Sequence, residues 1–271
     1  MYKLVGCDLD GTLLNSSSAV STENLKAISK IKEQGKEFAV VTGRTLGEIP
    51  RELLDLSDIK YIIYSDGAVI YDNEEKKVIY SEYIDKATVK QVYELLSSYD
   101  TMTEIFENGV PKVNLSKLSE SAYEYYEIDE SYRPVITQTR RGYTSLSKEL
   151  DSFDKAEIFD VFFKNFADRQ RCFEILSNIE AVGVTTSMVN NLEITAAGVT
   201  KGKALQRLCN ILGIKKDEVI AVGDSSNDIS MLACAGMALV PSNAEDKIKQ
   251  AATQVICSND ENVVKYIAEN F

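Results

Sequence analysis

The sequence predicts an α/β fold: a mostly parallel sheet with helices on both faces, plus an α+β domain inserted between the two halves of that sheet. Three observations support this prediction. Short apolar runs alternate with helical patterns at the start of the chain, the same alternation returns at its end, and an aromatic-rich stretch separates them. Alternating strands and helices with short connections form parallel sheets, and their right-handed crossovers place helices on both faces.

The first half of the sheet is expected in residues 1–81. Its strands are predicted by short apolar runs at 3–7, 37–41 and 61–64. A helix is predicted between the first two strands because apolar residues recur at helical spacing from Leu25 to Ile31, before Gly35 supplies a C-terminal cap. Residues 47–56 predict another short helix.

The second half of the sheet is expected in residues 191–271, where the alternation returns. Its strands are predicted at 219–222, 237–240 and 254–256. Its helices are predicted at about 203–212, 227–234 and 244–252, followed by a last helix. The two ends of the chain therefore predict the halves of one Rossmann-like, mostly parallel sheet.

Residues 82–190, between the two halves, have a different composition. Most of the tyrosines and phenylalanines of the chain lie there. Helical spacing from Val89 to Leu96 and β-rich runs at 157–163 and 181–187 predict an α+β structure for this stretch. We therefore expect it to form a domain of its own, inserted into the sheet-forming core.

Composition and charge argue against several classes of protein. The chain of 271 residues is 44% apolar and 27% charged, as globular proteins are, and its net charge of −12 without any basic run argues against nucleic-acid binding. No apolar run approaches the ~20 residues that span a bilayer, and no apolar leader begins the chain, so we expect a cytoplasmic protein with no membrane partner. Five scattered cysteines without a CxxC pair fit the same reducing compartment.

Carboxylates are the leading candidates for chemistry, because the chain has no histidine and therefore no histidine-based triad, zinc site or acid–base catalyst. The first predicted strand runs into Asp8-Leu9-Asp10-Gly11-Thr12 at the carboxyl edge of the sheet, where open α/β sheets bind ligands. In a continued strand, Asp8 and Asp10 would point the same way, and two close carboxylates need a proton or a cation such as Mg²⁺. The alternative is a pair of solvated turn aspartates.

This segment resembles a motif of a known family. An Asp-Leu-Asp-Gly-Thr run after an N-terminal hydrophobic strand is similar to the first motif of the haloacid dehalogenase (HAD) superfamily of phosphatases and phosphomutases. The resemblance implies that Asp8 is the nucleophile, that Asp10 is the general acid and base, and that both bind Mg²⁺. It also implies that the backbone N–H group of Leu9 holds the phosphoryl group.

Two further segments match the next motifs of the family in order. Thr42-Gly43-Arg44, at the end of the second predicted strand, is similar to the second motif, and the resemblance implies that these three residues bind the phosphoryl group or the substrate. Lys201 stands where the third motif has a fixed cation that shields the nucleophile and the transferring phosphoryl group. A lysine near a helix start opposes the helix dipole, which favours this functional reading over that of an exposed surface residue.

The fourth match is a Gly-Asp-Ser-Ser-Asn-Asp run that begins at Gly223, after another predicted strand. The resemblance implies that Asp224 is a direct metal ligand, that Asn227 contacts substrate or phosphate, and that Asp228 orients the metal through water or hydrogen bonds. A turn, an exposed lysine or a helix cap would explain each segment alone. Four matches in order, each at a predicted strand end, favour a phosphoryl-transfer site.

The place of the insertion indicates the branch of the family. The first two motifs lie close together, whereas the residues between Arg44 and Lys201 leave room for the aromatic-rich domain. This pattern resembles the Cof-type subfamily (class IIB cap), whose inserted α/β cap domain selects the substrate. One departure is Asp66-Gly67-Ala68, where the subfamily usually carries Asn-Gly-Ala. Because Asp suits a tight turn into a hairpin, we expect Asp66 to be structural, although a carboxylate near the site would weaken binding of an anionic part of the substrate.

The resemblance implies a Mg²⁺-dependent phosphatase that hydrolyses small phosphorylated metabolites, sugar phosphates or similar phosphomonoesters, through a phospho-aspartate. Two alternatives remain: a phosphomutase of the phosphomannomutase type, which would need a bisphosphate activator, and a non-catalytic phospho-ligand-binding regulator. The sequence does not name the substrate, because Arg140-Arg141 would either hold a second anionic group or remain a solvated pair. It contains no pattern that reveals the oligomeric state.

Overall fold

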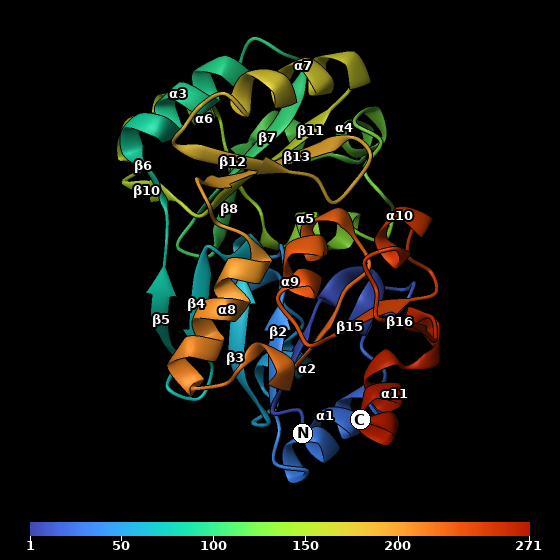
Figure 1. Ribbon diagram of the computed structural model, residues 1–271. Coiled ribbons are helices and arrows are strands. Elements are labelled where there is room, and N and C mark those ends of the chain that lie inside the picture. Colours follow the sequence, from blue (N-terminus) through green and yellow to red (C-terminus); the bar gives the residue numbers. More distant parts are fainter. The chain divides into compact units, whose positions relative to one another are not determined.

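The computed structural model describes all 271 residues and divides the chain into two compact units. Unit 1 contains Met1–Arg44, Ile49–Ser81 and Thr200–Phe271, and unit 2 contains Thr45–Glu48 and Glu82–Val199. Figure 1 shows the elements of both units.

The inserted unit ends at Val199 rather than at residue 190, where the sequence analysis placed its boundary. The reason is β13 (Asn191–Ala196), which pairs with β11 (Ile158–Phe163) and β12 (Val182–Thr185). Residues 191–199 therefore belong to unit 2, because the strand they contain completes the sheet of that unit.

Unit 1 is built on one eight-stranded sheet that joins both ends of the chain. In spatial order its strands are β16 (Gln254–Ile256), β15 (Met237–Pro241), β14 (Val219–Val222), β1 (Leu4–Cys7), β2 (Glu37–Val41), β3 (Ile59–Tyr64), β4 (Val69–Asp72) and β5 (Lys77–Ser81). All neighbours are parallel except β3–β4 and β4–β5. Because β1 pairs with both β2 and β14, the two halves predicted from the sequence form one mostly parallel sheet.

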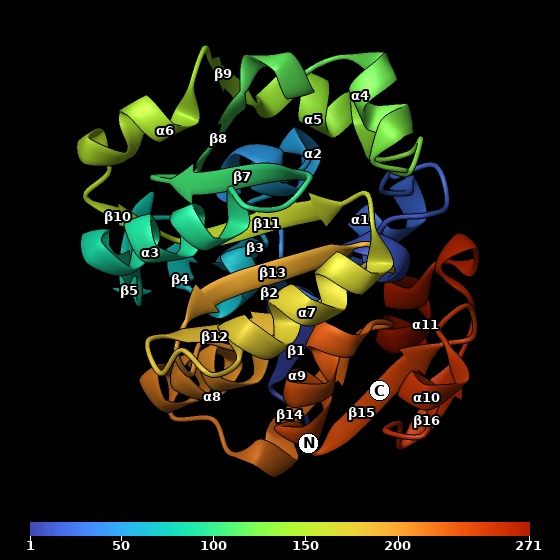
Figure 2. The same cartoon turned by 90° about the horizontal axis from the view of Figure 1, so that it is seen from above.

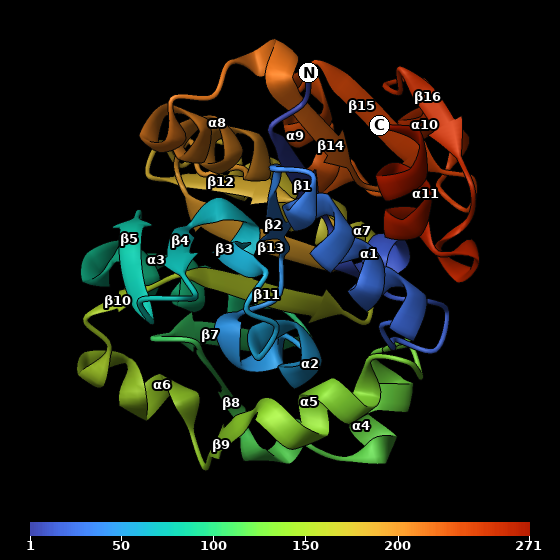
Figure 3. The same cartoon turned by 90° about the horizontal axis from the view of Figure 1, so that it is seen from below.

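Helices cover both faces of this sheet. They are α1 (Thr22–Glu33), α2 (Arg51–Leu54), α8 (Lys201–Leu212), α9 (Ile229–Ala233), α10 (Asp246–Lys249) and α11 (Val263–Asn270). Figure 3 shows α8 and α9 on one side of the sheet and α1 and α11 on the other. Leu205 and Leu208 of α8 pack with Val41 and Ala221 of the strands in one buried apolar cluster, which fixes α8 against the sheet.

The ends of α1 follow its sequence. Ser21 caps the start, because its hydroxyl accepts a hydrogen bond from the backbone N–H of Asn24 at 3.0 Å. Gly35 follows the end with a φ of +78°, as its predicted capping role requires. The helix predicted at 47–56 is shorter than expected and covers only Arg51–Leu54, because Pro50 lacks an N–H and disfavours helical backbone in the residue before it.

Unit 2 contains a six-stranded sheet and a small two-stranded one. The order of the larger sheet is β12, β13, β11, β7 (Thr101–Glu107), β8 (Val110–Asn114) and β9 (Arg141–Tyr143), and β10 (Lys155–Ala156) pairs with β6 (Ile84–Asp85). Its helices are α3 (Lys86–Leu96), α4 (Glu120–Tyr125), α5 (Arg133–Thr139), α6 (Leu146–Glu149) and α7 (Phe166–Leu176). Figure 2 shows β7, β11 and β13 side by side, so this unit has the α+β character that the sequence predicts.

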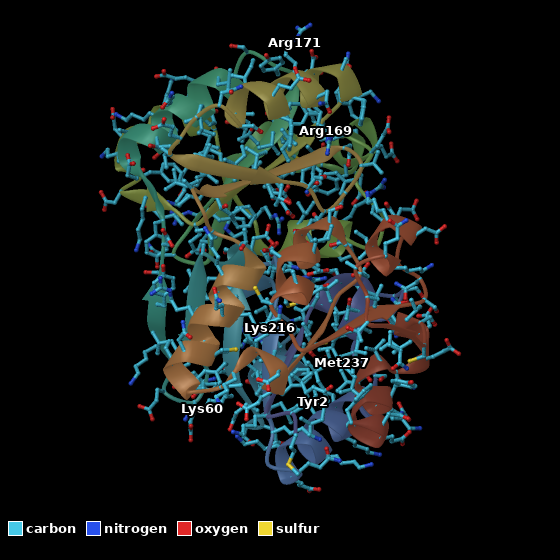
Figure 4. All side chains as sticks on the ribbon, in the orientation of Figure 1. Tyr2, Lys60, Arg169, Arg171, Lys216 and Met237 are labelled. Carbon is cyan, nitrogen blue, oxygen red and sulfur yellow. The ribbon has the colours of Figure 1, made fainter.

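The two arginines of α7 illustrate how that helix packs. Arg169 is nearly buried and donates from Nε to the backbone oxygen of Asn191 in β13 at 3.0 Å, whereas Arg171 is exposed and points away from the sheet (Figure 4). The polar face of α7 therefore meets solvent and its other face meets the sheet. No helix of the protein is long and apolar enough to cross a membrane.

Arg140 is the charged centre of unit 2. Its side chain is fully buried, and it pairs with Glu104 of β7 at 2.7 Å and with Glu48. The Tyr132 hydroxyl also lies 3.0 Å from Glu48 and 2.9 Å from the guanidinium group. Arg140 is therefore neither the solvated residue nor the anion-binding residue that the sequence left open, because two buried carboxylates already take its donors. Arg141, the other member of that pair, is exposed.

Candidate active site

The candidate residues meet because three neighbouring parallel strands end at the same edge of the sheet. Cys7 of β1 lies opposite Val222 of β14 and Val40 of β2. The residues that follow these strands therefore lie close together. A backbone hydrogen bond of 3.0 Å from the Asp8 N–H to the Val222 oxygen extends the pairing to the first of them.

Asp8 forms a buried ion pair with Lys201. The Asp8 side chain is 5% exposed and that of Lys201 only 2%, and 2.7 Å separates Nζ of Lys201 from Oδ1 of Asp8. The same ammonium group lies 2.8 Å from Oδ1 of Asp228. Burial would lower the pKa of Lys201, but Asp228 and Asp8 outweigh burial and raise this pKa well above its usual value. Lys201 is therefore a fixed positive charge beside the predicted nucleophile.

Lys201 is held by the start of α8. Thr200 caps this helix by accepting a hydrogen bond from the N–H of Lys203 at 3.1 Å. Gly202 lies so close to α9 that a Cβ there would come within 2.2 Å of the Ser230 backbone oxygen. The first turn of α8 thus packs directly against α9, and this packing places the Lys201 side chain beside Asp8 and Asp228.

Three carboxylates form the acidic group of the site. One oxygen each from Asp8, Asp224 and Asp228 lies within 4.8 Å of the others. Burial, followed by the charge of Asp228, raises the pKa of Asp224 from 3.8 to about 7, and the same two causes raise the pKa of Asp8 well above its usual value. One lysine thus faces three carboxylates, an excess of negative charge that a metal ion would relieve.

Backbone geometry brings these carboxylates together. Oδ2 of Asp228 accepts hydrogen bonds of 3.0 Å from the N–H groups of Asp224 and Ser225. A Cβ at Gly223 would lie 2.5 Å from Cγ of Asp228, so this position needs glycine. Gly11 has a φ of +72°, and a Cβ there would lie 2.3 Å from Oδ2 of Asp224. The two glycines of the motifs therefore create the space that the acidic group occupies.

Asp10 lies apart from this acidic group. Its side chain is 52% exposed, and Arg44 holds it with two hydrogen bonds of 2.8 and 2.6 Å. Asp8 and Asp10 would point the same way only in a strand that continued through both of them. Strand β1 stops at Cys7, and a tight turn of helical type begins at Leu9. In the three-carboxylate group, Asp228 stands where the sequence analysis had expected Asp10.

The second motif follows β2 as predicted. Thr42 is buried, and its hydroxyl accepts a hydrogen bond of 3.1 Å from the N–H of Arg44. Leu9, whose backbone was predicted to hold the phosphoryl group, has a fully buried side chain. The Arg44 guanidinium faces Asp10, a pairing that no sequence pattern indicated because the two residues stand 34 positions apart.

The fourth motif brings Asn227 into contact with Asp66. Nδ2 of Asn227 donates to Oδ1 of Asp66 at 3.0 Å, and Asp66 is only 3% exposed. Sequence reasoning also missed Thr12, whose hydroxyl donates to Oδ1 of Asp224 at 3.0 Å. Asp in place of the usual Asn at position 66 was the available signal for the first contact, and the position of Thr12 inside the first motif was the signal for the second.

Comparison with known proteins decides the family. The model of the haloacid dehalogenase-like hydrolase family matches residues 5–267. The chain belongs to the haloacid dehalogenase-like hydrolases. This HAD-like hydrolase is 30% identical to the phosphatase YwpJ of Bacillus subtilis, over 99% of each chain. It is 31% identical to the 5-amino-6-(5-phospho-D-ribitylamino)uracil phosphatase YwtE of the same organism, over 98% of this chain and 97% of the relative.

Solved structures agree with this assignment. The HAD subclass IIB sugar phosphatase BT4131 superimposes with a TM-score of 0.83 at 23% identity, covering 100% of this chain and 99% of its own. At that identity the likeness concerns the fold. The family model and the curated relatives confirm the HAD family that the motifs predict, and this HAD-like hydrolase is an enzyme of the phosphatase class that acts on phosphoric monoesters.

Proposed function

We propose that this phosphatase depends on Mg²⁺ and hydrolyses small phosphorylated metabolites, sugar phosphates or similar phosphomonoesters, through a phospho-aspartate on Asp8. The observation that carries the proposal is the buried Lys201 ammonium group, 2.7 Å from Oδ1 of Asp8 and next to Asp228. Phosphoryl transfer depends mainly on positioning and charge stabilisation, and a cation fixed beside a buried carboxylate provides both.

The donor set fits a hard divalent cation. Asp8, Asp224 and Asp228 offer three carboxylate oxygens within 4.8 Å of one another, and Mg²⁺ prefers such oxygens. When bound there, the ion would neutralise negative charge on the phosphoryl oxygens. We do not assign the Asp10 carboxylate to the metal, because Arg44 already holds both of its oxygens.

In the first step, Asp8 attacks phosphorus. A bond forms between an Asp8 carboxylate oxygen and phosphorus, and the bond between phosphorus and the ester oxygen breaks. Asp10 must enter this step protonated, and it gives that proton to the leaving alkoxide. Lys201, Thr42, Arg44 and the backbone N–H groups of Leu9 and Gly43 hold the phosphoryl oxygens. The exposure of Asp10 supports its role, because an acid that serves a leaving group must be reachable.

In the second step, water hydrolyses the acyl phosphate. Its oxygen bonds to phosphorus, Asp10 takes the proton it loses, and the bond from Asp8 to phosphorus breaks to regenerate the carboxylate. Arg44 keeps the Asp10 carboxylate oriented through both steps. Asn227 contacts substrate or phosphate, and Asp228 orients the acidic group through its two backbone hydrogen bonds of 3.0 Å.

We assign substrate choice to the inserted unit, since the core supplies the same chemistry for any phosphoester. We also place the protein in the cytoplasm, on the strength of its five free cysteines. YwtE is named as a phosphatase of a phosphorylated ribityl compound, and BT4131 is named as a sugar phosphatase. The first panel of test substrates should therefore contain that ribityl compound and several sugar phosphates.

The deciding experiment measures phosphate release from that panel with Mg²⁺ and with EDTA. We expect turnover of several esters with Mg²⁺ alone and none with EDTA. Isomerisation of a sugar phosphate that requires added hexose bisphosphate would instead identify a phosphomutase. Saturable binding of the same esters without turnover would identify a phospho-ligand-binding regulator.

A further inference from the structure

Asp66 lies in a turn with unusual backbone geometry. Ser65 and Asp66 both have left-handed φ values, 50° and 54°, which residues other than glycine rarely adopt. Backbone hydrogen bonds tie this turn to the second motif: Ser65 N–H to the Arg44 oxygen at 2.9 Å, and Asp66 N–H to the Thr42 oxygen at 3.1 Å. Strain of this kind persists where surrounding structure enforces it, commonly at functional sites.

The Asp66 carboxylate is poorly satisfied for a buried group. Its Oδ1 accepts the bond from Asn227, whereas its Oδ2 is buried without a hydrogen-bond partner in the protein. Leaving a buried carboxylate oxygen unpaired costs stability. The charge of Asp66 also acts on Lys201, whose pKa it helps to raise. Turn formation alone does not explain a carboxylate here, because Asn fits a left-handed turn equally well.

The single bond that Asp66 makes has a fixed polarity. A carboxylate accepts hydrogen bonds and does not donate them, so Asn227 must present its NH₂ group to Asp66. The other end of the amide then accepts from the Ser225 hydroxyl at 2.5 Å. Both ends of Asn227 are thereby committed, and one N–H of its NH₂ group remains. An asparagine at position 66 would allow either orientation of the Asn227 amide.

We propose that Asp66 is a positioning residue that fixes the orientation of the Asn227 amide, so that Asn227 meets the substrate as a hydrogen-bond donor. This inference rests on the proposed phosphatase function. It assigns to Asp66 a task that a neutral turn residue cannot perform, and it makes the partner of Asn227 an oxygen of the phosphoryl group or of the leaving group.

The test exchanges the two side chains. Asn227→Asp sets two carboxylates against each other, whereas the double variant Asp66→Asn/Asn227→Asp restores a hydrogen bond of opposite polarity and keeps the net charge of the wild type. Asn227→Leu removes the donor without adding charge. Asp58→Asn serves as the matched control, because Asp58 also accepts one hydrogen bond within unit 1, from Ser29 at 2.5 Å. Melting temperature, kcat/KM for one reporter ester and stabilisation by inorganic phosphate are measured for all.

We expect Asn227→Asp to lower both melting temperature and kcat/KM. The double variant should regain the melting temperature of the wild type, yet keep a kcat/KM at least about tenfold lower and lose the stabilisation by phosphate, as Asn227→Leu should. Asp66→Asn should lower kcat/KM by at least about threefold while keeping the melting temperature of the wild type, because an amide accepts or donates equally well and no longer fixes the orientation of the Asn227 amide. Recovery of both melting temperature and kcat/KM by the double variant would overturn the proposal, as would wild-type kcat/KM in Asn227→Leu.

The phosphate measurement separates this proposal from the proposed function. A wild-type protein that is stabilised by phosphate but turns over no ester would refute the phosphatase function while leaving the polarity of the Asp66–Asn227 pair testable. Equal stabilisation by phosphate in the wild type and the double variant would refute the role of Asp66, whatever the activity.

Discussion

The ammonium group of Lys201 lies 2.7 Å from the carboxylate of Asp8, although 193 positions separate the two residues in the chain. Their meeting depends on the pairing of β1 with β14 and on the packing of α8 against α9. Both side chains are almost fully buried, so water does little to screen the attraction between them. The two partners are not equivalent. Lys201 keeps Asp228 at 2.8 Å when Asp8 is neutralised, whereas loss of Lys201 leaves the buried carboxylates without a cation.

Substitution of Asp8 by Asn should abolish turnover and leave the fold intact. The amide fills the same volume but is no nucleophile. Steady-state hydrolysis of an aryl phosphate, measured alongside thermal melting, tests this expectation. A variant that keeps its rate within tenfold of the wild type would remove Asp8 as the nucleophile.

Loss of the Lys201 charge should slow every substrate by a similar factor. In the proposed mechanism the cation stabilises charge that is common to all the transition states, so the order of preference should not change. Lys201→Met keeps much of the side-chain volume and Lys201→Ala does not, and comparing them separates loss of charge from loss of packing. The measurement is kcat/KM across a panel of phosphoesters.

Substitutions in residues 82–190 should have the opposite effect on that panel and change which ester is preferred. The Lys201 variants provide the reference for a uniform loss of kcat/KM across the panel. If variants of the inserted unit slowed all esters equally while the Lys201 variants reordered the panel, the division of chemistry and specificity between the two units would be wrong.

Without metal, the free energy of unfolding should fall as pH rises toward neutrality, because the buried Asp224 carboxyl group loses its proton. Its pKa is raised from 3.8 to about 7 in the folded state, so the folded state binds this proton more tightly than the unfolded state does. The resulting stability is fully present below about pH 4 and is lost as pH rises through about 7.

Thermal melting in EDTA across this range, for the wild type and Asp224→Asn, tests that dependence. The stability difference between them should shift against the wild type as pH rises. Saturating Mg²⁺ should reverse the trend in the wild type, because ion and proton compete for the same carboxylate. A pH-independent difference in EDTA would contradict the assignment, and unchanged Mg²⁺ affinity in Asp224→Ala would contradict its role as a ligand.

Substitution of Arg140 by Ala should lower the free energy of unfolding by about 3–5 kcal/mol, because Glu48 and Glu104 would stay buried without their cation. Urea unfolding measures this change. Arg141→Ala is the adjacent control, and since Arg141 is exposed we expect a change within about 0.5 kcal/mol. Equal effects of the two substitutions would show that the buried network does not stabilise unit 2.

Much of the fold could be predicted because it depends on local patterns. The predicted strands 37–41, 219–222 and 254–256 match β2, β14 and β16 residue for residue. Apolar runs bounded by turn residues mark buried parallel strands clearly. Short helices were harder to predict from the sequence. Helix α10 covers only Asp246–Lys249 of the predicted 244–252, because the residues on both sides of it form hydrogen-bonded turns and do not continue the helix.

The sequence by itself determined the family, the succession of strands and helices along the chain and the set of residues at the strand ends, since motifs and apolar periodicity are properties of neighbouring residues. Only the tertiary structure decided how the charges pair: Arg44 with Asp10, Asp228 with the metal-binding candidates, Asp66 with Asn227. The physical reason is that the partner of a charged or polar group depends on which loops meet and on how deeply they are buried. Strand pairing and helix packing across the whole chain fix both.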